Sequence, residues 1–217
     1  MNSDFPIVAT LMQLQTALVG LPQPLIDQMH AAGPFKVLIA TILSLRTRDD
    51  TTAVAAPRLF AVADTPQTMV TLSADEVAQL IYPVGFYRTK ARDILAICQQ
   101  LITQHAGEVP ADMTQLLALP GVGRKTANLV LAIGFGIPAI CVDIHVHRIC
   151  NRWGYLTTTT PEETEQVLRQ ALPSAFWIPI NGLLVTLGQQ ICHPTSPRCS
   201  LCPLRTVCAQ RGVTRHR

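Results

Sequence analysis

Apolar residues recur at helical spacing along most of the chain, and short segments with proline or glycine separate the runs. The first run places Ile7, Leu11, Leu14 and Leu18 on one face and stops at residues 20–22. A spacing of three or four residues is typical of an amphipathic α-helix. The alternating pattern of a β-strand is weak throughout, so this pattern predicts helices.

The same periodicity continues to the middle of the chain. A Ser73-x-x-Glu76 capping box predicts the start of one helix. The further helices are expected at residues 34–43, 51–60, 74–81, 88–105, 114–118, 124–133 and 144–153. We therefore predict an all-α protein with helices too short for a coiled coil. With 217 residues and 48% hydrophobic composition, the chain can form one large or two small helical domains.

The segment from Leu119 to Ala127 separates two of these helices and contains Gly121 and Gly123. Two short helices joined by a Gly-x-Gly turn form a helix-hairpin-helix motif. Glycine permits backbone angles closed to other residues and lets an incoming group approach the main chain. The N–H groups at the start of the second helix favour an anion. We expect the motif to hold a nucleic-acid phosphate.

Lys125 lies in the first turn of the second helix, where the helix dipole favours acids rather than cations. The chain has 3 lysines among its 17 basic side chains, so lysine at this position is unusual. An arginine stays charged, whereas a lysine amine can lose its proton and act as a nucleophile. A lysine that contacts a phosphate or solvent is the alternative interpretation.

Asp143 is the only carboxylate between Met113 and Pro161, and it directly precedes a predicted helix. Aspartate at that position caps the helix by accepting backbone N–H bonds. The cap role is compatible with catalysis, because it holds the carboxylate ionised and oriented. Together with Lys125, this fixed carboxylate would form a suitable pair for breaking a bond to a sugar carbon.

These motifs resemble those of a known enzyme superfamily. The hairpin at 119–127, the Gly/Pro loop at 134–138 and the acid Asp143 are similar to the helix-hairpin-helix, Gly/Pro, Asp superfamily of DNA glycosylases. Within it, the chain resembles the endonuclease III family from about Phe35 to the last cysteine. The resemblance implies that Lys125 and Asp143 are the catalytic pair.

The resemblance also implies an activity and a domain arrangement. The expected enzyme is a bifunctional DNA glycosylase and AP lyase of base excision repair. It would remove oxidised or ring-saturated pyrimidines through a lysine Schiff base and nick the strand by β-elimination. Residues 27–137 would form a six-helix barrel domain that contains the helix-hairpin-helix at about 113–134. Residues 1–26 and 138–217 would form a discontinuous iron–sulfur domain.

Two loops are expected to face the DNA groove. The family commonly has glutamine where Arg46 stands and a bulky apolar wedge where Phe86 stands. An enzyme that acts on a base must extrude it and fill or brace the vacated space. Arg46 departs from the family pattern, which leaves the opposite-base preference open. The other predicted DNA contacts are Gly121, Gly123, Arg124, His145 and Arg198.

Four cysteines are gathered near the end of the sequence, with the spacing Cys192-x6-Cys199-x2-Cys202-x5-Cys208. A structural zinc site usually pairs two Cys-x2-Cys units, and this segment has one. Unequal spacings suit a [4Fe–4S] cluster, and they match the cluster motif of the resembled family. We therefore predict that these four cysteines hold a [4Fe–4S] cluster that chiefly helps to dock DNA.

The distribution of charge supports a polyanionic partner. The formal net charge is +3, but no acidic residue follows Glu165, whereas six arginines do. A basic end on a near-neutral body is typical of nucleic-acid binding. The first residues lack the pattern of a signal peptide, and no apolar stretch predicts a membrane span. We expect a monomer on damaged double-stranded DNA in the reducing cytoplasm of a bacterial or archaeal cell, associated with the nucleoid.

Three other interpretations differ in class. A monofunctional mismatch glycosylase would generally lack the hairpin lysine, so Lys125 argues against it. A non-catalytic helix-hairpin-helix module would bind phosphates without needing the isolated Asp143. An iron–sulfur electron carrier would need neither the hairpin nor the one-sided arginines.

Overall fold

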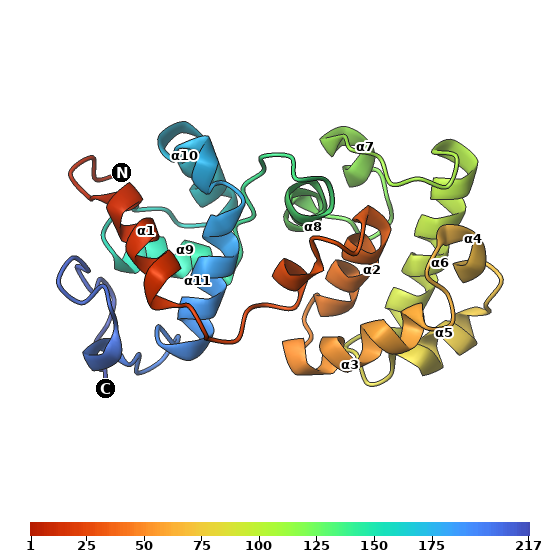
Figure 1. The fold of residues 1–217 in the computed structure, drawn as a ribbon, viewed down its shortest axis with the longest axis horizontal. Coiled ribbons are helices and arrows are strands. Elements are labelled where there is room, and N and C mark those ends of the chain that lie inside the picture. Colours follow the sequence, from red (N-terminus) through yellow and green to blue (C-terminus); the bar gives the residue numbers. More distant parts are fainter. The chain divides into compact units, whose positions relative to one another are not determined.

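The computed structural model describes all residues from 1 to 217, and it contains helices and no β-strand (Figure 1). The prediction of an all-α fold is therefore confirmed. Contacts between residues divide the chain into two compact units. We call Leu25–Ala139 the hairpin unit, and Met1–Pro24 with Ile140–Arg217 the cysteine unit. None of the helices combines the length and the hydropathy needed to cross a lipid bilayer.

The hairpin unit is built around helix α2. Every residue of α2 from Val37 to Leu43 is buried, as expected for a helix that is apolar on all sides. The unit consists of η1 (Ile26–Met29), α2 (Pro34–Ser44), α3 (Asp49–Phe60), α4 (Pro66–Met69), α5 (Ala74–Ile81), α6 (Tyr87–Gln104), α7 (Met113–Leu117), α8 (Arg124–Leu129) and η2 (Val130–Gly134). Helices α3, α6, α8 and η2 all contact α2, so the second helix of the hairpin packs on a largely buried helix.

The predicted helix at 124–133 differs from the observed one in its second half. The α-helix ends at Leu129, and Val130–Gly134 continues it as a π-helix. Gly134 packs closely on the start of α2, because a Cβ added there would lie 3.0 Å from Pro34 Cα. A π-turn is wider than an α-turn and alters which side chains face a neighbour. Apolar periodicity cannot distinguish these two kinds of turn.

The cysteine unit combines the first helix with the last third of the chain. It consists of α1 (Ile7–Ala17), α9 (Ile144–Arg152), α10 (Pro161–Ala171), η3 (Ser174–Phe176), α11 (Pro179–Gln190) and η4 (Cys199–Leu201). Helix α11 contacts both α1 and α9 (Figure 1). The ring of Phe5 lies 5.7 Å from Trp153 and 5.4 Å from Tyr155, so the start of the chain joins the apolar core of this unit.

Candidate functional site

The hairpin is formed by α7, a tight turn and α8. Asp112 caps α7, because its carboxylate accepts the Gln115 N–H at 2.9 Å. The turn is closed by the Val122 N–H, which donates to the Leu119 carbonyl at 3.2 Å. Gly121 has φ of 69°, a conformation that favours glycine. The predicted helix-hairpin-helix is therefore present.

Gly123 does not have the special backbone angles that were predicted for both glycines. Its φ is −98°, an extended conformation that other residues adopt readily. A Cβ added at Gly123 would meet no atom within 4 Å. Neither the backbone angle nor internal packing therefore requires glycine here. The predicted close approach of a phosphate to the main chain at this position stays a prediction.

The three lysines occupy three different environments. Lys36 forms an ion pair with Asp64 at 3.1 Å. Lys90 is buried and donates hydrogen bonds to the end of α2. Lys125 is exposed in the first turn of α8 and forms no hydrogen bond or ion pair. Its amine is thus the one lysine amine that the fold leaves available for a substrate.

Arg124, the neighbour of Lys125, is also exposed at the start of α8. The hairpin therefore presents two basic side chains in consecutive positions beside the exposed Gly123. A local concentration of positive charge at a turn with accessible backbone is suited to a phosphate. These positions agree with a nucleic-acid contact, and the contact itself stays a prediction.

Asp143 is the N-cap of α9 in the cysteine unit. Its Oδ1 accepts the His145 N–H at 2.8 Å and the Val146 N–H at 3.0 Å. Both bonds go to one oxygen, so they fix the carboxylate while Oδ2 receives neither of them. Asp143 is half-buried, and the preceding Val142 is buried in the core of the unit. The cap that the sequence predicted is therefore confirmed.

His145 is the second residue of α9 and packs against α11. A Cβ added at Gly188 of α11 would lie 2.2 Å from the His145 Nδ1, so the glycine makes room for the ring. The same nitrogen lies 3.1 Å from an Arg148 guanidinium nitrogen. The ring is half-buried and held by its own unit. Its predicted DNA contact stays a prediction.

Arg46 and Phe86 come from two neighbouring loops of the hairpin unit. Both side chains are exposed, and Phe86 retains 64% of its accessible surface. The Arg46 guanidinium lies 5.8 Å from the centre of the Phe86 ring, within the range of a cation–π interaction. The structure thus brings together two residues that are far apart in the sequence.

All four clustered cysteines line one cavity of the cysteine unit, and none forms a disulfide. Three arginines, Arg152, Arg198 and Arg205, also line it. No three His, Cys, Asp or Glu side chains of the chain converge closely enough to hold a single metal ion. The four cysteines share one cavity, and the predicted [4Fe–4S] cluster at this position stays a prediction.

Burial in this cavity raises the pKa of three of its thiols. Burial raises the pKa of the Cys202 thiol to about 11, and burial also raises the pKa of Cys199 and Cys208. Thiols with raised pKa values are protonated near neutral pH and release their protons on binding a metal. The Arg152 guanidinium lies 3.4 Å from Cys192 Sγ, which provides a positive partner for a thiolate at that position.

The sequence interpretation did not identify Arg148 and Arg152 as parts of this site. Arg152 donates to the His193 carbonyl at 2.6 Å and to the Pro194 carbonyl at 2.5 Å. Arg148 donates to the Cys192 carbonyl at 3.0 Å. The two arginines lie four residues apart on one face of α9, which is the signal that could have indicated them. They connect α9 to the backbone of residues 192–194, at the start of the segment that carries the four cysteines.

Lys125 belongs to the hairpin unit and Asp143 to the cysteine unit. Their predicted roles as a catalytic pair stay predictions. Lys125 has an exposed and unpartnered amine, and Asp143 has a carboxylate held through one oxygen.

Comparisons with known proteins identify close relatives. Residues 39–174 match the HhH-GPD superfamily of base excision DNA repair proteins. Endonuclease III of Thermotoga maritima is 49% identical over 81% of this chain and 82% of its own length. Endonuclease III of Escherichia coli K12 is 39% identical over 83% of this chain and 86% of its own. A structure of a non-covalent endonuclease III–DNA complex is 34% identical, with a TM-score of 0.86 over 97% of each chain.

Proposed function

Because this chain belongs to the HhH-GPD superfamily of base excision DNA repair proteins, within its endonuclease III group, we propose that Lys125 is its nucleophile and Asp143 its catalytic carboxylate. The activity of this group is that of a DNA N-glycosylase with AP lyase activity. The non-catalytic and electron-carrier interpretations are thereby set aside. The individual residue roles rest on the local geometry.

The exposed, unpartnered amine of Lys125 is the observation that carries the proposal. Lys36 is paired with Asp64, and the Lys90 ammonium is enclosed by three acceptors. Attack on a sugar carbon requires an amine that can reach the substrate and give up its proton. Lys125 meets the first requirement by its exposure in the first turn of α8.

Asp143 supplies a fixed negative charge. Two backbone N–H groups orient the carboxylate through Oδ1, so no reorganisation is needed when positive charge develops on the substrate. Breaking the bond between a base and C1′ develops positive charge on the sugar. A preoriented carboxylate stabilises that charge, whereas a neutral side chain of the same shape would not.

The reaction then follows from these two groups. The neutral Lys125 Nζ attacks C1′ and the bond to the damaged base breaks, with the base leaving as an anion that takes up a proton. The amine loses one proton, the C1′–O4′ bond breaks as Nζ and C1′ form a double bond, and O4′ takes up a proton, so the sugar ring opens and a protonated Schiff base remains. Removal of a C2′ proton then expels the 3′ phosphate by β-elimination, which nicks the strand. Hydrolysis of the Schiff base regenerates the lysine.

The DNA contacts remain those predicted from the sequence. The exposed backbone at Gly121 and Gly123, with Arg124, would hold a phosphate near the lesion. Arg46 and Phe86 would enter the duplex and brace the space left by the extruded nucleotide. The other predicted contacts are His145 and the exposed Arg198 beside the cysteine cavity.

Cys192, Cys199, Cys202 and Cys208 would hold a [4Fe–4S] cluster. Their common cavity and their free thiols support this assignment. The cluster would supply a structural crosslink of the loop that carries Arg198 and Arg205, with redox chemistry available to it in principle. Arg152 and Arg148 hold the same loop through its backbone carbonyls.

The proposed substrate is double-stranded DNA with an oxidised or ring-saturated pyrimidine or an abasic site. The similarity to a structure of an endonuclease III–DNA complex supports DNA as the partner. A monomer acting on the nucleoid of a bacterial or archaeal cell remains the predicted state and location.

Borohydride trapping tests the proposal on duplex DNA that contains thymine glycol or an abasic site. The wild-type protein should form a covalent adduct with both substrates, because borohydride reduces the Schiff base. Lys125→Gln should form none, while it retains DNA binding. Lys36→Gln is the matched control and should trap like the wild type. Strand cleavage that persists in Lys125→Gln would overturn the lysine assignment.

A further inference from the structure

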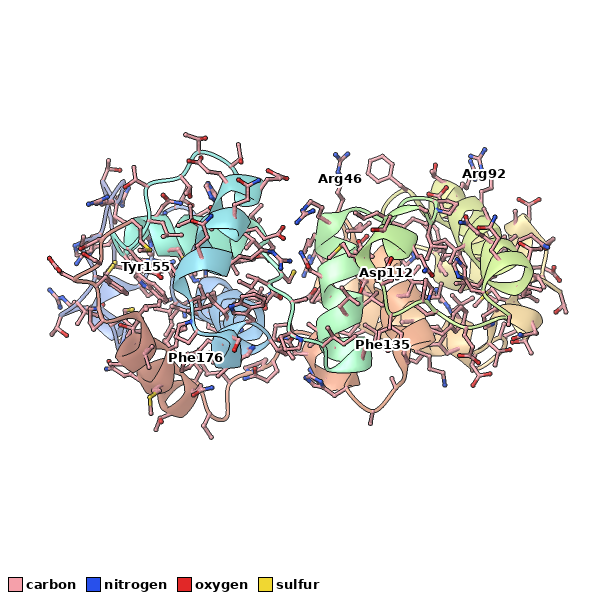
Figure 2. The ribbon with its side chains drawn as sticks, turned by 90° about the horizontal axis from the view of Figure 1, so that it is seen from above. Arg46, Arg92, Asp112, Phe135, Tyr155 and Phe176 are labelled. Atoms are coloured by element: carbon pink, nitrogen blue, oxygen red, sulfur yellow. The ribbon has the colours of Figure 1, made fainter.

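Arg46 and Phe86 share an unusual backbone conformation. Their φ angles are 51° and 57°, in the left-handed region that residues with side chains rarely adopt. Arg46 projects outward from the ribbon (Figure 2). Such strained positions persist only where surrounding contacts hold them, and they tend to occur at functional sites. The question is which contacts hold these two.

The two loops touch each other through their backbones. The Gly85 N–H, next to Phe86, donates to Thr47 Oγ1 at 3.1 Å, next to Arg46. A Cβ added at Gly85 would lie 2.8 Å from the Arg46 carbonyl oxygen, so only glycine permits this approach. The guanidinium of Arg46 also lies over the Phe86 ring, so the two loops are joined at both backbone and side chains. We call these two residues the Arg46–Phe86 pair.

Lys90 lies beneath this pair and is 6% exposed. Its ammonium donates to the Leu43 carbonyl at 2.8 Å, the Leu45 carbonyl at 2.5 Å and Thr47 Oγ1 at 3.1 Å. All three acceptors belong to the end of α2 and the loop that carries Arg46. Lys90 itself lies one turn into α6, whose N-cap is Phe86.

The chemistry of these contacts explains why the residue is a lysine. Three donors on one nitrogen match three converging acceptors, whereas a planar guanidinium would not. The carbonyls lie at the C-terminal end of α2, where a cation is favourable. No carboxylate pairs with Lys90, and burial lowers its pKa to about 8. Two backbone carbonyls and the Thr47 hydroxyl are its acceptors, so this buried charge secures the position of the loop.

We propose that Lys90 is a positioning residue for DNA recognition, joining the loop of Arg46 to the helix of Phe86 so that both side chains enter the duplex as one preformed unit. Thr47 is the shared connection, because its hydroxyl meets both Lys90 and the Gly85 N–H. This inference rests on the proposed DNA-facing roles of Arg46 and Phe86.

The test compares Lys90→Met, which keeps the length of the side chain and removes its donors, with the wild type. Lys36→Met is the matched control, since Lys36 lies in the same unit and its surface ion pair is unconnected to these loops. Duplex DNA carries thymine glycol opposite 2-aminopurine, whose fluorescence rises when it is unstacked. Single-turnover base removal is measured beside strand cleavage at a preformed abasic site.

Lys90→Met should remove the damaged base about tenfold to a hundredfold more slowly, because small displacements of positioning groups have effects of this size. The fluorescence rise should be lost, while cleavage of the preformed abasic site should change by no more than about threefold, since it needs less extrusion. Equal losses in both reactions, or an unchanged fluorescence rise, would overturn the inference.

A second pair of variants keeps the test decisive if Lys90→Met folds poorly. Thr47→Val removes the shared hydroxyl and should reproduce the selective loss of base removal. Thr47→Ser keeps the hydroxyl and should restore the wild-type rate and fluorescence. If Thr47→Val behaves like the wild type, Lys90 does not act through this connection.

Failure of the inference can be distinguished from failure of the proposed function. If Arg46→Ala and Phe86→Ala lose the fluorescence rise while Lys90→Met and Thr47→Val retain it, only the positioning role is wrong. If Arg46→Ala and Phe86→Ala both retain it, the DNA-facing roles of that pair are wrong. The lysine chemistry is judged separately by trapping with Lys125→Gln.

Discussion

In the proposed mechanism, the Asp143 side chain serves both the fold and the chemistry. Its Oδ1 caps α9 through two N–H groups, and its charge would stabilise positive charge on a reacting sugar. The cap role was predictable, because an aspartate directly before an apolar-periodic run is a local signal. The same locality explains why Lys125 could be singled out from its place in the motif.

The two roles of Asp143 can be separated by substitution. Asp143→Asn keeps a capping oxygen, so the free energy of unfolding should change by no more than about 0.5 kcal/mol, whereas Asp143→Ala should lose about 1 kcal/mol. Both variants lack the charge, so single-turnover base removal should fall by about a hundredfold or more in each. Urea unfolding and quenched single-turnover assays measure the two effects. Near-normal base removal by Asp143→Asn would contradict the electrostatic role.

Lys90 was not predictable as a structural residue, because its acceptors lie more than forty residues earlier in the chain. No periodic or capping pattern connects such positions.

The effect of Lys90 on stability has a defined pH dependence, since burial lowers its pKa from 10.5 to about 8. Below pH 8 both the folded and the unfolded chain carry the proton, and the penalty for the buried charge is fully present.

Between these two pKa values the unfolded chain binds more protons than the folded one, so the free energy of unfolding rises with pH. The free energy of unfolding of the wild type, measured relative to that of Lys90→Met, should therefore rise by about 2 kcal/mol from about pH 7 to about pH 9.5. Urea unfolding of both proteins at the two pH values measures it. A difference independent of pH would show that the buried amine does not titrate in this window.

At the scale of elements, local signals placed most helix starts correctly. The Ser73–Glu76 capping box is present, with the Ser73 N–H donating to the Glu76 carboxylate at 2.7 Å. Helices α4, α10 and α11 were not predicted. For α10 the start signal was present, because Thr160 precedes Pro161 and caps the helix. The π-helical continuation of α8 could not be read from periodicity, because it depends on packing against α2.

The two hairpin glycines lead to different expectations. Gly121→Ala should destabilise the protein by about 1–2 kcal/mol, because alanine is strained at φ of 69°. Gly123→Ala should lose no more than about 1 kcal/mol, the usual difference between glycine and alanine at an N-cap. DNA affinity should nevertheless fall at least about tenfold in Gly123→Ala if a phosphate approaches its backbone.

Fluorescence anisotropy on an abasic-site duplex, beside urea unfolding, measures both quantities for the two variants. Unchanged DNA affinity in Gly123→Ala would show that the open space at this position is not a phosphate contact. The prediction concerns the hairpin alone, because both glycines lie between α7 and α8.

At the scale of the whole molecule, the chain crosses between units twice. The cysteine unit takes its first helix from the start of the sequence and the rest from Ile140 onward. Composition and periodicity could not indicate this arrangement, because nothing local links Phe5 to Trp153 and Tyr155. The resemblance to a known family was what suggested a discontinuous domain. The two proposed catalytic groups come from different units, so neither unit alone holds the pair.

The most direct test of the central claim is to locate the covalent bond. Wild-type protein is trapped with borohydride on abasic-site DNA, digested with nuclease and protease, and mapped by mass spectrometry. The account predicts that the reduced sugar fragment is attached to Lys125 and to no other amine. Attachment to Lys36, Lys90 or the N-terminal amine would contradict the assignment of Lys125 as the nucleophile.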